Sequence, residues 1–138
     1  MVFTPEPLVG VSALVQSEQG LIALVKRLKE PYAGRWAFPG GLINYGEETV
    51  KAVVREVKEE TGLDVVLEGL LGVYDIIRLE GPVRYHYVTV CFKARSLNLD
   101  IRPGSDAEEA KWFKAEEIKP GMVTQTTLKA LRDAGVLR

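Results

Sequence analysis

The chain has very little cysteine and histidine, with Cys91 and His86 as single representatives among 138 residues. A lone cysteine excludes a disulfide within the chain and is compatible with a reducing compartment, so we expect a cytoplasmic protein. No pattern of serine, histidine and aspartate indicates a hydrolytic triad, and no motif marks Cys91 as a nucleophile. We therefore expect Cys91 to be a small buried side chain and His86 to be a packed residue of a strand.

The chain also lacks an excess of charge of one sign and long apolar runs. The 18 lysines and arginines nearly balance the 19 aspartates and glutamates, and no basic block is present. This balance argues against a nucleic-acid partner. No apolar run reaches membrane-spanning length and the N-terminus lacks the features of a signal peptide, so we expect no membrane partner. What is present is 46% apolar residues, enough to form the core of one domain over residues 1–138.

The chain alternates between stretches typical of strands and stretches typical of helices. Apolar runs over residues 8–15 and 21–27 are separated by a polar turn, which predicts a hairpin. Gly69 and Gly72 predict bends or bulges in a later strand region. A second, amphipathic helix is expected over residues 124–134. This order of elements predicts one layered domain of the α/β or α+β class.

The stretch over residues 40–63 has the most informative order of parts. Two glycines come first, then a polar turn, then a helix crowded with carboxylates. We expect this helix to begin near Glu47 or Glu48 and to end at Thr61, because Gly62 is suited to the left-handed cap that follows a helix.

One face of this helix carries three carboxylates. At about 100° per residue, Glu59 lies about 60° to one side of Glu56, and Glu60 lies about 40° to the other. The four valines of the helix fill the adjoining arc and are expected to pack on a sheet. Carboxylates at this spacing repel one another, so they indicate either a solvated acidic face or a site for a hard divalent cation such as Mg²⁺ or Mn²⁺.

The spacing around the helix resembles the Nudix box. Gly41 is followed after five residues by Glu47 and, after seven more, by the run R-E-V-K-E-E-T-G-L over residues 55–63. This fits G-x5-E-x7-R-E-U-x-E-E-x-G-U, with U aliphatic, at every fixed position. Two flanking segments, W-A-F-P-G over residues 36–40 and E-A-K-W-F over residues 109–113, are also similar to the family. The resemblance to Nudix hydrolases implies an α/β/α sandwich with a mixed β-sheet between helices.

The resemblance also implies how the box binds metal and substrate. It makes the Gly40 carbonyl and the carboxylates of Glu56, Glu59 and Glu60 the metal ligands, with Mg²⁺ as the cofactor and Mn²⁺ as its alternative. Because glycine lets the backbone come close to a phosphate, Gly40 and Gly41 are both expected to contact the substrate.

The group that accepts a proton from water is open among several carboxylates. Glu56 and Glu60 are catalytic candidates by resemblance, and Asp106 or Glu108 in a later acidic run is a loop carboxylate that offers an alternative general base. A solvated acidic turn explains the same run equally well. Arg55 is a further catalytic candidate, while the family's pairing of this arginine with the first glutamate of the box favours a structural role.

Aromatic side chains are candidates for stacking on a nucleobase. Spacing does not choose among them, but Tyr74 and Tyr85 lie in segments that look like family members acting on ADP-ribose. The whole candidate set is Phe3, Tyr32, Trp36, Phe38, Tyr74, Tyr85 and Tyr87.

The resemblance implies Mg²⁺-dependent hydrolysis of a phosphoanhydride in a nucleoside diphosphate linked to a second group, first of all ADP-ribose, giving AMP and ribose 5-phosphate. Leu79 stands where the family's marker for ADP-ribose has proline, and Pro82 follows three residues later. A nucleoside triphosphate is therefore the alternative substrate. A third reading is a Nudix domain that binds nucleotides as a sensor without hydrolysis, although the intact box favours an enzyme. The expected partner is a small nucleotide, and a homodimer is an expectation from the resemblance alone.

Overall fold

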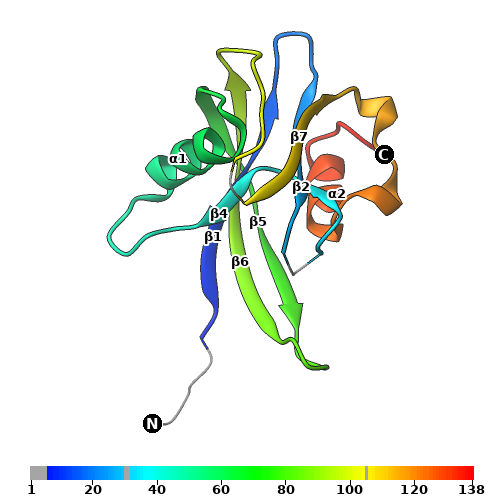
Figure 1. Cartoon of the computed structure of the whole chain (residues 1–138). Helices are drawn as coiled ribbons and strands as arrows, with labels where there is room; N and C mark the ends of the chain where they lie inside the picture. Colours follow the sequence, from blue (N-terminus) through cyan, green and yellow to red (C-terminus); the bar gives the residue numbers. More distant parts are fainter. Residues whose placement is uncertain (1–5, 30–31, 105) are drawn as a thin grey trace.

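The computed structural model describes residues 6–29, 32–104 and 106–138. Within these ranges, two α-helices lie against a seven-stranded sheet (Figure 1). In chain order the elements are β1 (Leu8–Gln16), β2 (Ile22–Arg27), β3 (Trp36–Ala37), β4 (Gly40–Leu42), α1 (Thr49–Thr61), β5 (Val65–Arg78), β6 (Tyr85–Ser96), β7 (Ala107–Phe113), the 3₁₀ turns η1 (Ala115–Glu117) and η2 (Pro120–Met122), and α2 (Gln125–Asp133).

The sheet is mixed, as the resemblance implied. Its strand order is β3-β2-β1-β6-β5, with β4 paired to β1 and β7 paired to β2. The β1–β6 pair is parallel and runs from Leu8 opposite Tyr87 to Gln16 opposite Arg95, while the other pairs are antiparallel. The predicted hairpin between β1 and β2 is confirmed only at its closed end, where Gln16 lies opposite Ile22. Beyond that point β2 diverges, because it pairs with β7 instead.

The two faces of the sheet carry separate apolar clusters. Val11, Ala13 and Val15 of β1 pack with Val53 and Val57 of α1 on one face. The alternating residues of β1 face the other way, and the cluster on that side includes Leu14, Ile22, Leu24, Ala130 and Leu131, the last two from α2. Because β1 is covered on both faces, its sequence reads as a nearly continuous apolar run. The result is the expected α/β/α sandwich.

Helix α1 has nearly the predicted bounds. Glu48 is its N-cap, and Gly62 follows Thr61 with φ of 75°, its amide donating to the Lys58 carbonyl at 2.9 Å. The face of α1 that packs on the sheet is narrower than predicted. Ala52, Val53 and Val57 are buried, whereas the other two valines of the helix remain exposed, because the helix meets the sheet along one stripe only.

Strands β5 and β6 form a long hairpin that projects beyond both helices (Figure 1). The predicted bulges are confirmed, since the register of β5 shifts between Leu67 and Gly69 and again between Leu70 and Gly72. Cys91 of β6 is buried, also as expected. No helix within the described ranges combines the length and the apolar character that a membrane span requires.

Candidate active site

The C-terminal half of α1 lies against the two glycines of β4. The Gly40 amide donates to Oε1 of Glu60 at 2.7 Å. A Cβ atom at Gly41 would occupy the position of the Glu56 carboxylate, whereas a Cβ atom at Gly40 would collide with the backbone carbonyl of Val11, so Gly40 is the position that requires glycine. The sequence thus places its glycines where helix carboxylates approach the backbone most closely. We call Glu56, Glu59 and Glu60 the carboxylate cluster.

Arg55 ties this part of the box together. Its Nε and Nη2 donate to the Glu47 carboxylate at 2.7 and 2.8 Å, and its Nη1 donates to Oε1 of Glu56 at 2.8 Å and to Oε2 of Glu59 at 3.2 Å. The hydrogen bond from Arg55 lowers the pKa of Glu47 to about 2, and the reciprocal bond raises the pKa of Arg55. The expected Arg55–Glu47 pair is present, and it holds the loop before α1 onto the helix.

Burial raises the pKa of Glu56 and Glu60, the two carboxylates that face Gly40 and Gly41, whereas the hydrogen bond from Arg55 lowers that of Glu47. Desolvation raises the pKa of Glu56, against the opposing effect of the hydrogen bond from Arg55. Desolvation also raises the pKa of Glu60 to about 7, partly offset by the hydrogen bond from the Gly40 amide. Nearby charges act in both directions: Glu56 and, to a smaller extent, Asp106 raise the pKa of Glu60, whereas Arg27 lowers it. Placing a cation beside these buried carboxylates would therefore be electrostatically favourable.

The loop that precedes β7 and the acidic run beginning at Asp106 lies against the end of α1. The Arg102 amide donates to the Thr61 carbonyl and the Gly104 amide to the Glu60 carbonyl, both at 3.0 Å, so the loop is fastened to the last turn of α1. This brings Asp106 close enough to act electrostatically on Glu60. Glu108, the other predicted candidate, lies within β7 rather than in a loop, and its half-exposed carboxylate faces Lys26 at 3.9 Å.

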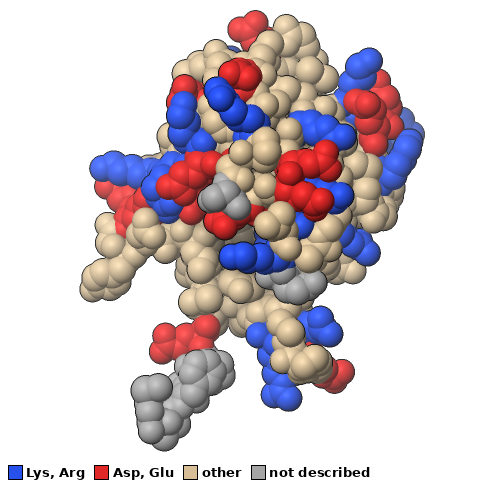
Figure 2. All heavy atoms as spheres, viewed as in Figure 1, with Lys and Arg blue, Asp and Glu red and all other residues tan. Residues whose placement is uncertain are grey.

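Figure 2 shows this acidic region on the surface, where red side chains gather near the middle of the face over the end of α1 and the beginning of β7. Within the described residues, no three acidic, histidine or cysteine side chains are already grouped as a metal site. Arg55 holds Glu59, and the Gly40 amide holds Glu60. The donor set nevertheless consists of carboxylate and carbonyl oxygens around a cradle that a Cβ atom would fill. These residues fit a hard divalent cation.

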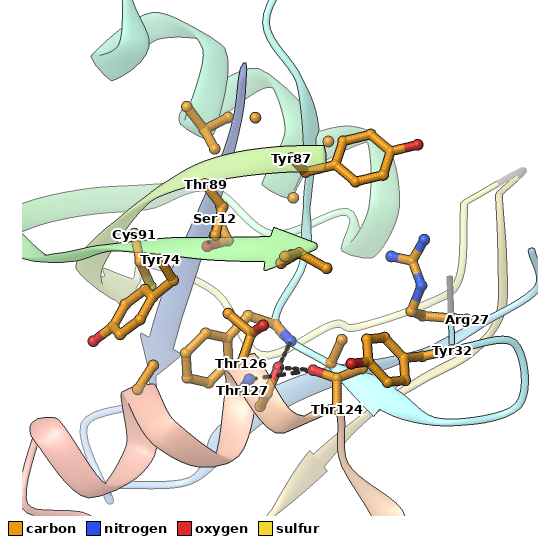
Figure 3. A pocket seen from close by; sticks show the side chains of 18 of the residues that line it. Ser12, Arg27, Tyr32, Tyr74, Tyr87, Thr89, Cys91, Thr124, Thr126 and Thr127 are labelled. Atoms are coloured by element: carbon orange, nitrogen blue, oxygen red, sulfur yellow. Dashed lines mark hydrogen bonds between the residues drawn. The ribbon is translucent and has the colours of Figure 1, made fainter. Parts of the chain in front are cut away.

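A cavity of about 200 Å³ lies beside β4, between the sheet and α2 (Figure 3). It includes Gly40 and Gly41, so it adjoins the carboxylate cluster directly. Its walls come from β1, β2, β5, β6 and the beginning of α2. Among its lining residues are Ser12, Arg27, Tyr32, Phe38, Tyr74, Ile76, Tyr87, Thr89, Cys91, Thr124, Thr126 and Thr127.

Most of the polar side chains that line the cavity carry neutral hydroxyls. The hydroxyls of Ser12 and Thr89 are 3.1 Å apart on adjacent strands. The Thr127 hydroxyl accepts from the Phe38 amide at 3.3 Å and lies 2.9 Å from the Thr124 hydroxyl. Such groups can hydrogen-bond a sugar or a base without requiring charge on the ligand.

The aromatic candidates separate into distinct environments. Tyr74 lines the cavity but is buried, and its hydroxyl donates to Oδ2 of Asp133 at 2.8 Å, which links β5 to α2. Burial, followed by this contact, raises the pKa of Tyr74. Tyr85 is not among the described residues that line the cavity, although its ring centroid is 5.8 Å from that of Tyr87, which does line it. Phe3 lies outside the described residues.

Sequence reasoning missed Arg27 and the hydroxyl residues of the cavity. Three of these hydroxyl residues lie close together in the run T-Q-T-T over residues 124–127. In the sequence, such a run most directly indicates the N-terminal cap of a helix. Capping is indeed part of its role, because the Thr127 amide donates to the Thr124 hydroxyl at 3.2 Å. The same threonines also face the cavity, which only the packing of α2 shows.

Comparison with known proteins agrees with this geometry. Residues 6–134 match the NUDIX domain family. An ADP-ribose pyrophosphatase of Methanocaldococcus jannaschii is 36% identical over 107 residues, which cover 78% of this chain and 62% of the relative. A human 8-oxo-dGDP phosphatase is 34% identical over 107 residues, covering 75% of this chain and 31% of the relative. The matched region is thus less than two thirds of either relative.

Solved structures share the fold. The crystal structure of a MutT NUDIX hydrolase from Burkholderia pseudomallei superimposes with a TM-score of 0.81 at 32% identity, covering 93% of this chain and 98% of that one. The match to the family extends over nearly the whole described chain, including the carboxylate cluster and both walls of the cavity. The protein therefore belongs to the Nudix family.

Proposed function

We propose that the chain, acting as one domain, is a metal-dependent hydrolase of the phosphoanhydride bond in a small nucleotide. The observation that carries this proposal is the position of the carboxylate cluster: the carboxylates of Glu56 and Glu60 converge on Gly40 and Gly41 at the edge of a cavity whose polar lining is mostly neutral hydroxyls. A diphosphate spanning that edge would have one neutral end group in the cavity and its charged linkage at the carboxylates.

Glu56, Glu59, Glu60 and the Gly40 carbonyl are the groups that would hold the cation, Mg²⁺ or Mn²⁺. When bound, the cation neutralises phosphate charge and lowers the pKa of a coordinated water. Glu56, Glu60, Asp106 and Glu108 are the candidates to accept the proton as water attacks phosphorus and the bridging P–O bond breaks. Asp106 is favoured over Glu108 because it lies beside the loop that is fastened to the last turn of α1, although its exposed carboxylate is also 4.0 Å from Lys29. Arg55 orients the carboxylates through its hydrogen bonds.

ADP-ribose is the first candidate substrate, supported by the pyrophosphatase of Methanocaldococcus jannaschii, and hydrolysis would give AMP and ribose 5-phosphate. The second candidate is a nucleoside di- or triphosphate, including oxidised forms, supported by the human 8-oxo-dGDP phosphatase. Leu79, which replaces the marker proline for ADP-ribose, is exposed in the turn after β5 and does not line the cavity. This position therefore does not decide between the two.

A substrate panel with Mg²⁺ and with EDTA tests the proposal. Glu56→Gln and Glu60→Gln are each expected to lower turnover at least a hundredfold, since both remove a charged oxygen donor from the cluster. Glu48→Gln is the matched control, because that carboxylate is exposed at the N-cap of the same helix and pairs with Lys51 at 3.7 Å.

The outcomes separate the three hypotheses. Turnover of ADP-ribose or of nucleoside triphosphates identifies the substrate. Ligand-dependent thermal stabilisation without product in any reaction would identify a nucleotide-binding domain instead. Near wild-type turnover in both Gln variants would refute the role of the cluster.

A further inference from the structure

Arg27 connects the cavity to the carboxylate cluster. Its side chain lines the cavity together with Gly40 and Gly41, and its charge acts on Glu60. Among the described residues that line the cavity, Arg27 is the charged one. Its guanidinium therefore stands where a neutral group in the cavity would continue into a phosphate at the cluster.

The backbone holds Arg27 firmly in this position. Its amide donates to the Arg35 carbonyl at 2.9 Å, and its carbonyl accepts from the Gly34 amide at 2.8 Å. The register of β2 against β7 shifts between Lys26 and Arg27. An irregularity of this kind changes the direction of the side chain relative to its strand. Lys26 faces Glu108 and Glu109 of β7, at 3.9 and 3.8 Å, whereas Arg27 lines the cavity.

Two tyrosines, Tyr32 and Tyr87, line the cavity together with Arg27. Figure 3 shows Arg27 on the side of the cavity where Tyr87 and Tyr32 lie, with one ring on either side of it in this view. Tyr32 has φ of 63°, a left-handed conformation that is unfavourable for a tyrosine. A strained loop residue whose ring lines the cavity suggests that this wall is shaped for a ligand.

Arg55, the other arginine of the site, is directed elsewhere. Its donors are engaged with Glu47, Glu56, Glu59 and the Leu42 carbonyl, and it is not among the described lining residues. Within the part of the chain that the structure describes, Arg27 and not Arg55 is therefore the arginine that lines the cavity.

We propose that Arg27 is a substrate-binding residue that recognises the phosphate attached to the sugar in the cavity. The neutral hydroxyl walls would accept the nucleoside, and the planar guanidinium would bind its phosphate through two parallel hydrogen bonds. This inference rests on the proposed function, because it assumes that the nucleoside end of the substrate enters the cavity. It makes Arg27 the residue that selects phosphorylated over neutral ligands.

Calorimetric titration with AMP and with adenosine, in EDTA, tests the proposal without hydrolysis. The readout is the ratio of the two affinities. Arg27→Ala is expected to lower the preference for AMP by roughly tenfold to a hundredfold, the effect of losing hydrogen bonds to a charged group, while adenosine affinity changes less than about twofold. Arg27→Lys should retain part of the preference, since it keeps the charge but loses the planar fork.

Arg95→Ala is the matched control, because Arg95 is an exposed arginine that pairs with Glu68 on the surface at 3.7 Å. It should leave the ratio unchanged. Thermal unfolding verifies each variant, and Arg27→Gln replaces Arg27→Ala if the alanine variant does not fold. An unchanged ratio in these variants, or no binding of either ligand to the wild type, would overturn the proposal. The two proposals can also fail separately. If the Arg27 variants lose the preference for AMP but the wild type hydrolyses no substrate, the role of Arg27 in phosphate binding is supported and the proposed hydrolase activity is refuted.

Discussion

The two halves of the site are built in opposite ways. On the α1 side, the carboxylates of Glu56 and Glu60 lie in close contact with the backbone of Gly40 and Gly41, where burial disfavours their charge. On the α2 side, neutral hydroxyls and aromatic rings form the walls, and their hydrogen bonds are satisfied within the protein. The α1 side is arranged to bind a charged group and lowers the stability of the fold, whereas the α2 side contributes stability and determines the shape of the cavity. Three measurements test this difference.

The largest effect is expected from Glu60. An acid whose pKa rises from 4.5 in the unfolded chain to about 7 in the fold binds more protons when folded, so the contribution of Glu60 to stability is most favourable at low pH and decreases as pH rises from about 4.5 to 7. Above pH 7 the full penalty is present, up to about 3 kcal/mol. Glu60→Gln removes it, so in EDTA at pH 8 the variant should be more stable than the wild type by a substantial part of that amount.

Urea unfolding at pH 5 and pH 8 measures this. The advantage of Glu60→Gln should shrink at pH 5 and should also shrink at pH 8 when Mg²⁺ stabilises the wild type. Glu59→Gln is the control, because the Glu59 side chain is 58% exposed and its substitution should change stability by less than about 0.5 kcal/mol. An advantage of equal size at both pH values would show that burial of this charge is not its cause.

A smaller effect is expected at Gly104, where the loop crosses the last turn of α1. A Cβ atom there would collide with the Glu59 carbonyl, so Gly104→Ala must displace the loop and should cost about 2 kcal/mol. Gly121→Ala is the control, since a Cβ atom there meets nothing within 4 Å. Equal unfolding free energies for the two variants would show that the loop tolerates displacement.

The smallest effect is expected at Tyr74, on the α2 side. Tyr74→Phe keeps the ring that lines the cavity but removes the hydrogen bond to Asp133, so stability should fall by about 1 kcal/mol. Tyr45→Phe, at a fully exposed tyrosine, should change nothing measurable in the same urea titration. A stability gain in Tyr74→Phe would mean that this link between β5 and α2 is strained.

Much of the α1 side could be predicted from the sequence. Helix α1 ends at Thr61 as predicted and begins only one or two residues later than expected, because a left-handed glycine and a carboxylate-rich periodic segment are local signals. The bulges at Gly69 and Gly72 were likewise predicted from glycine alone. The shared face of Glu56, Glu59 and Glu60 follows from helix geometry, and Arg55 was expected to contact Glu47.

The α2 side was not predictable in the same way. Ser12, Arg27, Tyr87 and Thr126 come from four distant parts of the chain and meet only when β1 pairs in parallel with β6 and α2 packs across the sheet. Tyr85 and Tyr87 look equivalent by alternation, yet only Tyr87 lines the cavity, because Tyr85 lies two residues nearer the projecting end of the hairpin.

The sequence by itself therefore determined the helix, its acidic face and the glycines that face it, since these depend on residues within one turn or one loop of each other. Only the tertiary structure decided which side chains surround the cavity, that Arg27 joins it to the carboxylate cluster, and that the loop before Asp106 is fastened to the last turn of α1. The physical reason is that periodicity specifies which face of an element is buried, whereas the partners across that face depend on strand pairing over long separations in the chain.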